Sequence, residues 1–211
     1  MKEDTDVATE ETHPSETKII LTLLITFLII VAVTAVAYNR LHKPAAQLES
    51  YTFNGFTFVR AGVFWITQVQ IENKLINIPL HYGPKELRHI DIAGQLNESF
   101  NYGPIYITFD PDAKNLSMLT LAAAELSLNL AQGIDRQLIA ACATNTTDAC
   151  TARPIINCEN TDAAVIYLRE GGTPYVKFDG NCIVVRGQDK ELLKAVDQLL
   201  LYWYRIYKPT E

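Results

Sequence analysis

The sequence predicts an α+β protein: an N-terminal transmembrane helix, then a mixed sheet with a C-terminal amphipathic helix. Three observations predict this class. Ile19–Tyr38 is a run without a charged side chain. From Tyr51 onward, short segments alternate apolar and polar residues as strands do, and turn residues separate them. Two later segments instead repeat apolar residues at helical spacing.

The composition is that of a folded, acidic chain. Its 211 residues are 48% hydrophobic, which is enough to bury a core and excludes global disorder. The net charge is −6, and lysine and arginine do not cluster. Nucleic-acid binding along phosphates is therefore excluded.

The apolar run Ile19–Tyr38 has the length of a membrane span, since a helix rises ~1.5 Å per residue and a bilayer core is ~30 Å thick. We therefore expect the lipid bilayer as a partner. The alternative is a signal peptide cut after Ala35-Val36-Ala37. The long run and the long acidic tail before it favour an uncleaved anchor.

The flanking segments are polar. Residues 1–18 carry six acidic side chains against two lysines and predict a disordered tail. Residues 39–50 predict a juxtamembrane linker, in which Pro44 stops the helix from continuing. Residues 51–211 form the predicted domain. Positive residues are almost balanced across the span, so the cysteines must indicate its orientation.

All four cysteines lie in the C-terminal half: Cys142, Cys150, Cys158 and Cys182. An even, clustered set in an anchored chain predicts disulfides and an extracytoplasmic domain. Of three connectivities we favour Cys142–Cys150 and Cys158–Cys182. Zinc ligation is the alternative, although no CxxC pair is present, and free thiols in a cytosolic domain are another.

Three N-x-S/T sequons are weak support for the same location, at Asn97, Asn115 and Asn145. Asn145 is the best glycosylation site because it lies in a polar loop between two cysteines. Asn115 opens a predicted helix and is equally explained by a structural role.

The first half of the domain predicts strands. An antiparallel unit is predicted from Tyr51 to about Tyr82, with a turn at Asn54-Gly55. The segment that follows, Pro84–Gly103, is predicted to be a connection. A βαβ unit follows, from the Ile105–Phe109 strand through a helix ended by Gly133 to a strand at Leu138–Ala143.

The turn between this first strand and its helix contains Asp110 and Asp112. Asp112 is the expected N-cap of the helix. A pair of carboxylates after a strand is also typical of a cation site, which is the less favoured interpretation.

The last segments predict a three-stranded meander and a helix. The strands are Ala164–Leu168, Tyr175–Phe178 and Cys182–Arg186, and the helix runs from about Asp189 to Tyr204. The expected solvent-facing side of the helix comprises Lys190, Glu191, Lys194, Asp197 and Gln198. Tyr202, Tyr204 and Tyr207 do not all fit its apolar side, so we expect some of them to contact a partner.

Catalytic motifs are absent from the sequence, which has no GxSxG, P-loop or GxGxxG pattern. The domain's two histidines, His81 and His89, flank Glu86 but lack a third ligand at a metal-site spacing, so exposed loop positions are expected. We therefore predict no enzymatic activity, no cofactor and no metal.

Five short segments are distinctive: Tyr51–Phe58, Trp65-Ile66-Thr67, Pro154–Cys158, Asp179–Ile183 and Ala195-Val196-Asp197. With these segments the chain resembles a group of uncharacterised, single-pass membrane proteins of small-genome archaea. These motifs are turns, cysteines and a terminal helix. The resemblance implies a cell-membrane location, and it carries no implication about activity.

Together these features predict a membrane-anchored, extracytoplasmic envelope protein that acts as a non-enzymatic protein-interaction or structural module. Its expected partner is another envelope or membrane protein. A ligand-binding or sensory ectodomain is the alternative, and a tethered hydrolase is the second alternative.

Overall fold

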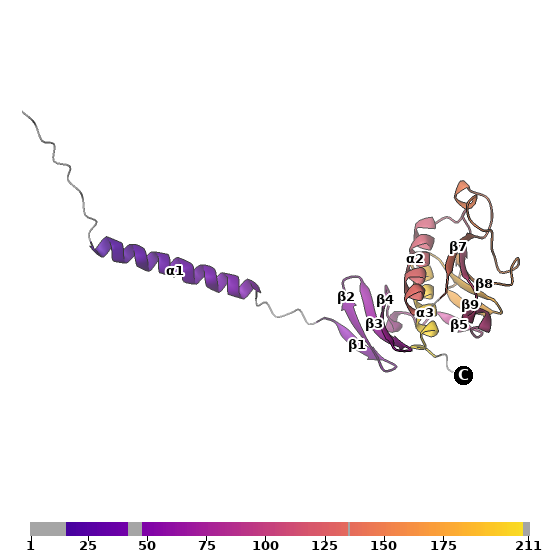
Figure 1. Ribbon diagram of the computed structural model, residues 1–211, viewed down its shortest axis with the longest axis horizontal. Coiled ribbons are helices and arrows are strands. Elements are labelled where there is room, and N and C mark those ends of the chain that lie inside the picture. The colour runs from indigo at the N-terminus through magenta and orange to yellow at the C-terminus, as the bar shows by residue number, and fades with distance from the viewer. Residues whose placement is uncertain (1–15, 42–47, 135, 209–211) are drawn as a thin grey trace, which may run out of the picture. The chain divides into compact units, whose positions relative to one another are not determined.

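The computed structural model describes residues 16–41, 48–134 and 136–208 (Figure 1). The chain divides into two units, residues 1–47 and 48–211. Residues 1–15 of the expected acidic tail and 42–47 of the expected linker lie outside the described residues, whereas residues 16–18 and 39–41 belong to a helix and Ser50 begins a strand.

The described residues of the first unit form the helix α1 (Glu16–Leu41). Its Lys18–Tyr38 part has a mean hydropathy of 3.0, and it is the one helix of the described chain long and apolar enough to cross a membrane. The hydroxyls of Thr22, Thr26 and Thr34 donate to carbonyls in the preceding turn, so they carry no unpaired donor into an apolar environment. Length and composition alone also fit a signal sequence, since the helix lies near the N-terminus.

The second unit begins with a four-stranded antiparallel sheet, as predicted. Its strands lie in chain order: β1 (Ser50–Phe53), β2 (Phe56–Ala61), β3 (Phe64–Ile71) and β4 (Lys74–Leu80). Asn54 and Gly55 make the first turn with φ values of 48° and 84°, a region in which glycine and asparagine are favoured.

The second sheet has six strands in the order β5-β9-β10-β8-β6-β7. They are β5 (Asp91–Ala93), β6 (Ile105–Phe109), β7 (Leu138–Cys142), β8 (Ala164–Glu170), β9 (Tyr175–Asp179) and β10 (Cys182–Gly187). The predicted βαβ unit is confirmed, since α2 (Leu116–Gly133) joins the parallel neighbours β6 and β7.

Two parts of the predicted sheet were wrong. The N-terminal strands form a sheet of their own and do not extend the mixed one. The last three strands are no meander, because β10 lies between β8 and β9 and runs parallel to β8. β10 is the most apolar of the three, whereas β9 carries exposed Lys177 and Asp179. The interior position therefore suits β10.

The expected connection Pro84–Gly103 contains the short strand β5 and two 3₁₀ turns, η1 (Pro84–Glu86) and η2 (Glu98–Asn101). β5 pairs with β9 at the edge of the sheet. Three residues are too few to show a period of two, which is why the alternation did not reveal this strand.

Helices α2 and α3 (Lys190–Trp203) pack against each other between the two sheets (Figure 1). The core accordingly fills both helix–sheet interfaces. Asp197 and Gln198, expected on the solvent-facing side of α3, are 0% and 2% exposed. The expectation failed because a helix between two sheets has almost no face left for water.

The connection from β7 to β8 crosses from the carboxyl end of one parallel strand to the amino end of the next. Residues 143–163 make this crossover with only one short 3₁₀ turn, η3 (Asp148–Cys150). The Cys142–Cys150 bridge holds its start and the Cys158–Cys182 bridge holds its end. Disulfides therefore hold a crossover that usually contains a helix.

Candidate functional site

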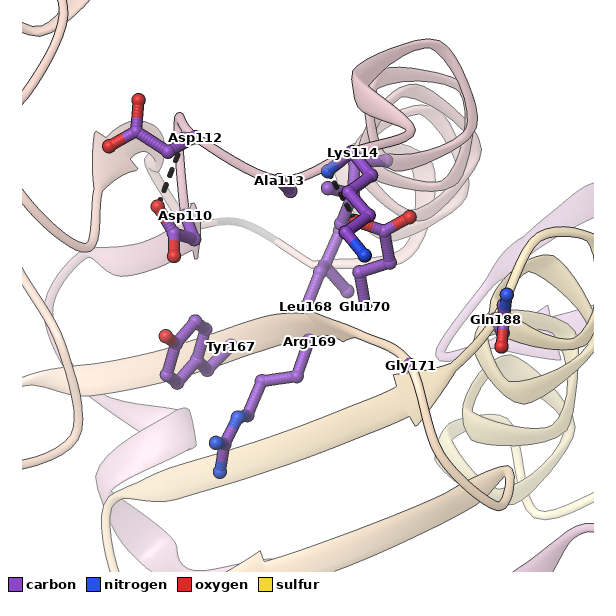
Figure 2. A pocket seen from close by; sticks show the side chains of 11 residues that line it. Asp110, Asp112, Ala113, Lys114, Tyr167, Leu168, Arg169, Glu170, Gly171 and Gln188 are labelled. Carbon is purple, nitrogen blue, oxygen red and sulfur yellow. Dashed lines mark hydrogen bonds between the residues drawn. The ribbon is translucent and has the colours of Figure 1, made fainter.

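The carboxyl ends of β6, β8 and β10 surround a cavity of about 380 Å³, here called the strand-end pocket (Figure 2). It is lined by Asp110, Asp112, Ala113, Lys114, Leu119, Tyr167, Leu168, Arg169, Glu170, Gly171 and Gln188. Figure 2 shows the two aspartates across the cavity from Tyr167 and Arg169, with Lys114 and Glu170 together on one side.

The topology accounts for a cavity at this edge. From β6 the chain continues to β7 on one side, whereas from β8 it continues to β9 on the other side. Where neighbouring parallel strands send their connections in opposite directions, the loops separate and leave a crevice. Ligands of open α/β sheets bind in such crevices, so the position itself is typical of a binding site.

The turn residues of this pocket have roles other than those expected. Asp112 was predicted to cap α2, but the cap is Asn115, whose side chain accepts from the Met118 amide at 3.2 Å. The Asp112 amide instead donates to Asp110 Oδ1 at 3.0 Å. Because α2 begins at Leu116 and not directly after Asp112, both carboxylates belong to the loop before the helix, where they line the pocket.

Backbone and side-chain contacts hold the pocket walls in place. Glu170 Oε2 accepts from the Lys114 amide at 2.6 Å, which joins the end of β8 to the start of α2. The pKa of the Tyr167 hydroxyl is raised, mainly because the hydroxyl is buried. The positive charge of Arg169 opposes this shift, and the negative charges of Asp110 and Glu159 add to it. Tyr167 thus lies between groups of both charges.

A second cavity, of about 450 Å³, lies at the end of α3 and is called the C-terminal groove. Its lining residues are Gln95, Leu96, Asn101, Tyr202, Trp203, Arg205, Tyr207 and Lys208. Two of the three tyrosines expected to contact a partner, Tyr202 and Tyr207, are among them. The groove combines aromatic rings with two cations, the composition typical of protein interfaces.

Tyr204, the third of these tyrosines, has a structural role instead. Its hydroxyl donates to the Asn129 carbonyl at 2.6 Å, and its ring lies where a Cβ on Gly133 would collide. Burial raises the pKa of this hydroxyl to about 12. The side chain therefore joins α3 to α2 and does not face a partner.

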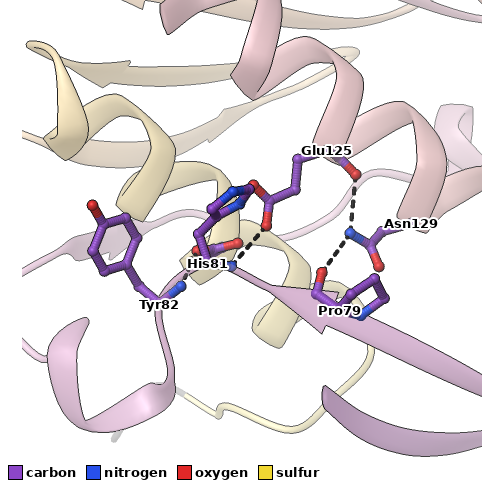
Figure 3. A network of polar contacts seen from close by, with 6 residues as sticks. Pro79, His81, Tyr82, Glu125 and Asn129 are labelled. Atoms are coloured by element: carbon purple, nitrogen blue, oxygen red, sulfur yellow. Dashed lines mark hydrogen bonds and ion pairs between the residues drawn. The ribbon is translucent and has the colours of Figure 1, made fainter. Parts of the chain in front are cut away.

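A polar network joins β4, α2 and α3 inside the domain (Figure 3). Glu125 accepts from the His81 amide at 3.0 Å and lies 2.5 Å from His81 Nδ1. Asp197 Oδ2 accepts from the Tyr82 amide at 2.8 Å. Burial, and next the charge of Glu125, raise the pKa of Asp197 well above its usual range. Burial therefore favours the protonated form of Asp197, and this buried network does not line any of the pockets described above.

The two histidines of the domain pair with different carboxylates. His81 binds Glu125, whereas His89 Nε2 lies 2.6 Å from the Glu191 carboxylate of α3. Glu86, which separates them in sequence, accepts from the Trp65 indole at 3.1 Å. The three side chains considered as metal ligands are thus not brought together, and the described part of the chain holds no other such group.

The three sequons differ in accessibility. Asn145 is exposed in the loop closed by the first disulfide. The Asn97 side chain is exposed but accepts from the Ser99 amide. The Asn115 side chain both caps α2 and donates to Asp189 at 2.6 Å. Asn145 is thus the position with the least structural role, as its loop suggested.

Sequence reasoning missed Glu125, Asp197 and Arg186. Glu125 and Asp197 are charged residues on apolar helices. In the sequence this is only a weak sign of a buried polar network, because it does not show that both helices are buried. Arg186 ends a strand as many surface arginines do. Its partners come from the turn after β8 and from β9, so only the sheet order places them together.

Comparison of the chain with protein-family models, with curated proteins and with solved structures finds no match.

Proposed function

We propose that this chain is a non-enzymatic envelope protein, anchored in the cell membrane by Ile19–Tyr38, with its folded domain on the extracytoplasmic side. Two disulfides support the oxidising location. The charge-free helix supports the anchor. The resemblance to archaeal single-pass proteins points to the same location.

The domain acts in this proposal as a protein-interaction module that binds another envelope or membrane protein through the C-terminal groove. The observation that carries it is the gathering of Tyr202, Trp203 and Tyr207 with Arg205 and Lys208 around one cavity. Tyrosine, tryptophan and arginine dominate the binding energy of protein interfaces. The two cations select a partner surface with acidic groups.

Photo-crosslinking in native membranes tests the partner surface. With a benzophenone amino acid in place of Tyr207, we expect one discrete protein adduct, because the groove holds its partner within reach of the probe. The same probe in place of Leu128, a 67% exposed residue of α2, is the control. Identical adduct patterns at both positions would overturn the assignment of the groove.

The location has its own test. Protease added to intact cells is expected to remove residues 48–211, because the domain lies outside, and the mature chain is expected to retain Ile19–Tyr38 in an intact-mass measurement. A protected domain would overturn the orientation. A mature chain that begins near Tyr38 would show cleavage after Ala37 and would overturn the anchor.

A ligand-binding ectodomain is the second candidate, and the strand-end pocket favours it. The pocket offers acidic and basic groups on opposite walls at the edge where α/β sheets bind small molecules. Its walls hold no nucleophile–histidine pair among the described residues, so the pocket supports binding in preference to hydrolysis.

A further inference from the structure

Two side chains of opposite charge line the strand-end pocket without pairing with each other. Asp110 follows β6 and Arg169 belongs to β8, and both contribute to the cavity wall. Within the described residues, neither side chain forms an ion pair, so their charged atoms are too far apart to contact each other directly. Separated, unpaired charges of opposite sign in one cavity favour a ligand that carries both charges.

The ring of Tyr167 lies between these two charges (Figure 2). Arg169 Cζ is 5.6 Å from the centre of the ring. Burial raises the pKa of the Tyr167 hydroxyl, and the nearby charges of Arg169 and Asp110 shift it in opposite directions. Both charged groups therefore act on the same side chain, which brings them within reach of one small molecule that lies against the ring.

The Asp110 carboxylate is held in place by the turn to which it belongs. Its Oδ1 accepts from the Asp112 amide at 3.0 Å, and the carbonyl of Asp110 accepts from the Ala113 amide at 3.2 Å. The other carboxylate oxygen accepts no hydrogen bond from a described residue. It is therefore available to a ligand ammonium group, in the strong form of hydrogen bond in which both partners are charged.

The Arg169 guanidinium is also available to a ligand. It is exposed, lies against the Tyr167 ring and forms no hydrogen bond to a described residue. The adjacent carboxylate of Glu170 does not neutralise it, because Glu170 Oε2 accepts from the Lys114 amide at 2.6 Å and no ion pair joins the neighbours within the described chain. A guanidinium presents paired N–H donors that match the two oxygens of a carboxylate.

The volume of the cavity and the rest of its wall indicate the kind of molecule that fits. At about 380 Å³ the cavity lies near the lower limit of the ~300–1,000 Å³ typical of small-molecule sites. Besides the charged groups, its wall contains Ala113, Leu119 and Leu168, whose apolar side chains suit a short hydrocarbon segment. These features favour a small molecule with a short aliphatic part over a polymer.

We propose that the strand-end pocket binds a small zwitterion, an aminocarboxylic acid, with its ammonium group at Asp110 and its carboxylate at Arg169. Each charge of the ligand then meets an opposite charge that the fold leaves unpaired. A cation alone would use only the acidic wall and an anion alone only the basic wall, so neither accounts for both. The inference deepens the ligand-binding candidate for this pocket and rests on it, and it does not depend on the C-terminal groove.

Calorimetric titration of the full chain in uncharged-detergent micelles tests the site. The probes are glycine, 4-aminobutyrate and 6-aminohexanoate, which separate the ammonium and carboxylate groups by increasing lengths of chain. Butylamine and butyrate, which carry only one of the two charges, are the control ligands. We expect saturable binding of at least one zwitterionic probe, about ten-fold or more tighter than that of either control, because each control loses one charged contact.

Variants of the two charged residues assign the binding to this pocket. Asp110→Asn keeps an oxygen for the Asp112 amide, and Arg169→Gln changes an exposed side chain, so both variants are expected to fold. Each is expected to weaken binding about ten-fold or more, the typical effect of losing one charged hydrogen bond. Asp162→Asn and Lys177→Gln remove one exposed charge of each sign outside the cavity and are expected to leave binding within about two-fold.

Binding that is tighter for a zwitterion than for both controls, and that both pocket variants weaken, supports the proposal. If no zwitterionic probe binds saturably, or if Asp162→Asn or Lys177→Gln weakens binding as much as the pocket variants do, the proposal is overturned. Equally tight binding of butylamine or butyrate also overturns it but leaves the ligand-binding candidate. The adducts of the Tyr207 probe report on the C-terminal groove alone, so the two proposals fail separately.

Discussion

Replacing Cys158 and Cys182 together by serine is expected to lower the free energy of unfolding by about 3.5 kcal/mol. The bridge joins residues 24 positions apart, and the entropy of the unfolded chain that a cross-link removes grows with the loop it closes. Its partners are the end of the irregular crossover and the first residue of β10. Without the bridge, that end is held by only a few hydrogen bonds, among them those of Asn181 to the Thr161 and Ala163 carbonyls.

The other bridge provides the matched control. Cys142 and Cys150 are 8 positions apart, so the same entropy argument gives a loss of about 2.6 kcal/mol for their double serine variant. Equilibrium urea unfolding of both variants measures the difference. Equal losses, or a larger loss for the Cys142/Cys150 variant, would contradict the ranking by loop length.

Asp197→Asn is expected to make the domain more stable at neutral pH. Burial raises the pKa of Asp197 in the folded state, whereas the unfolded chain has the ordinary value of ~3.9. Between these two values the folded state holds a proton that the unfolded state releases, so stability falls as the pH rises from about 4 towards the folded pKa. Asparagine keeps the acceptor for the Tyr82 amide, places an N–H donor where the second carboxyl oxygen of Asp197 lies, and does not titrate.

The difference between the variant and the natural chain isolates Asp197 from its neighbours. Glu125 from α2, His81 after β4 and Glu86 from η1 remain in both proteins. Melting temperatures at pH 4 and pH 7 are expected to show a gain for the variant that is larger at pH 7. Asp162→Asn, at an exposed position, is the control and is expected to show no such difference. A gain of the variant over the natural chain that is smaller at pH 7 than at pH 4 would contradict this prediction. It would show that Asp197 is ionised in the folded domain.

Local sequence patterns were sufficient to predict an element wherever the element is long or its turn residues are specific. The apolar run gave α1, the alternation from Tyr51 onward gave four antiparallel strands, and Asp179-Gly180 marked the hairpin of β9 and β10. The favoured cysteine pairing agrees with the two bridges of the structure. Each of these features depends on neighbours close in sequence, and their physical basis is therefore visible in the sequence.

Local patterns were insufficient to predict which strands and side chains contact each other when they are distant in sequence. The period of two in β8 and β10 shows which side chains share a face, but it does not show that the two strands are neighbours. The strand-end pocket follows from that strand order. Likewise, Asp112 and Asn115 are both good N-caps, and the contacts of Asn115 with Met118 and Asp189 decide between them.

By itself the sequence determined the apolar helix, the cysteine-rich second half and the class of most elements, because periodicity, charge and turn chemistry act over a few residues. Only the tertiary structure decided that the N-terminal strands separate into a second sheet and that both helices lie between the sheets. That arrangement buries Asp197 and encloses Tyr204. Burial and strand order depend on the whole chain, since each face of an element is polar or apolar only relative to what packs against it.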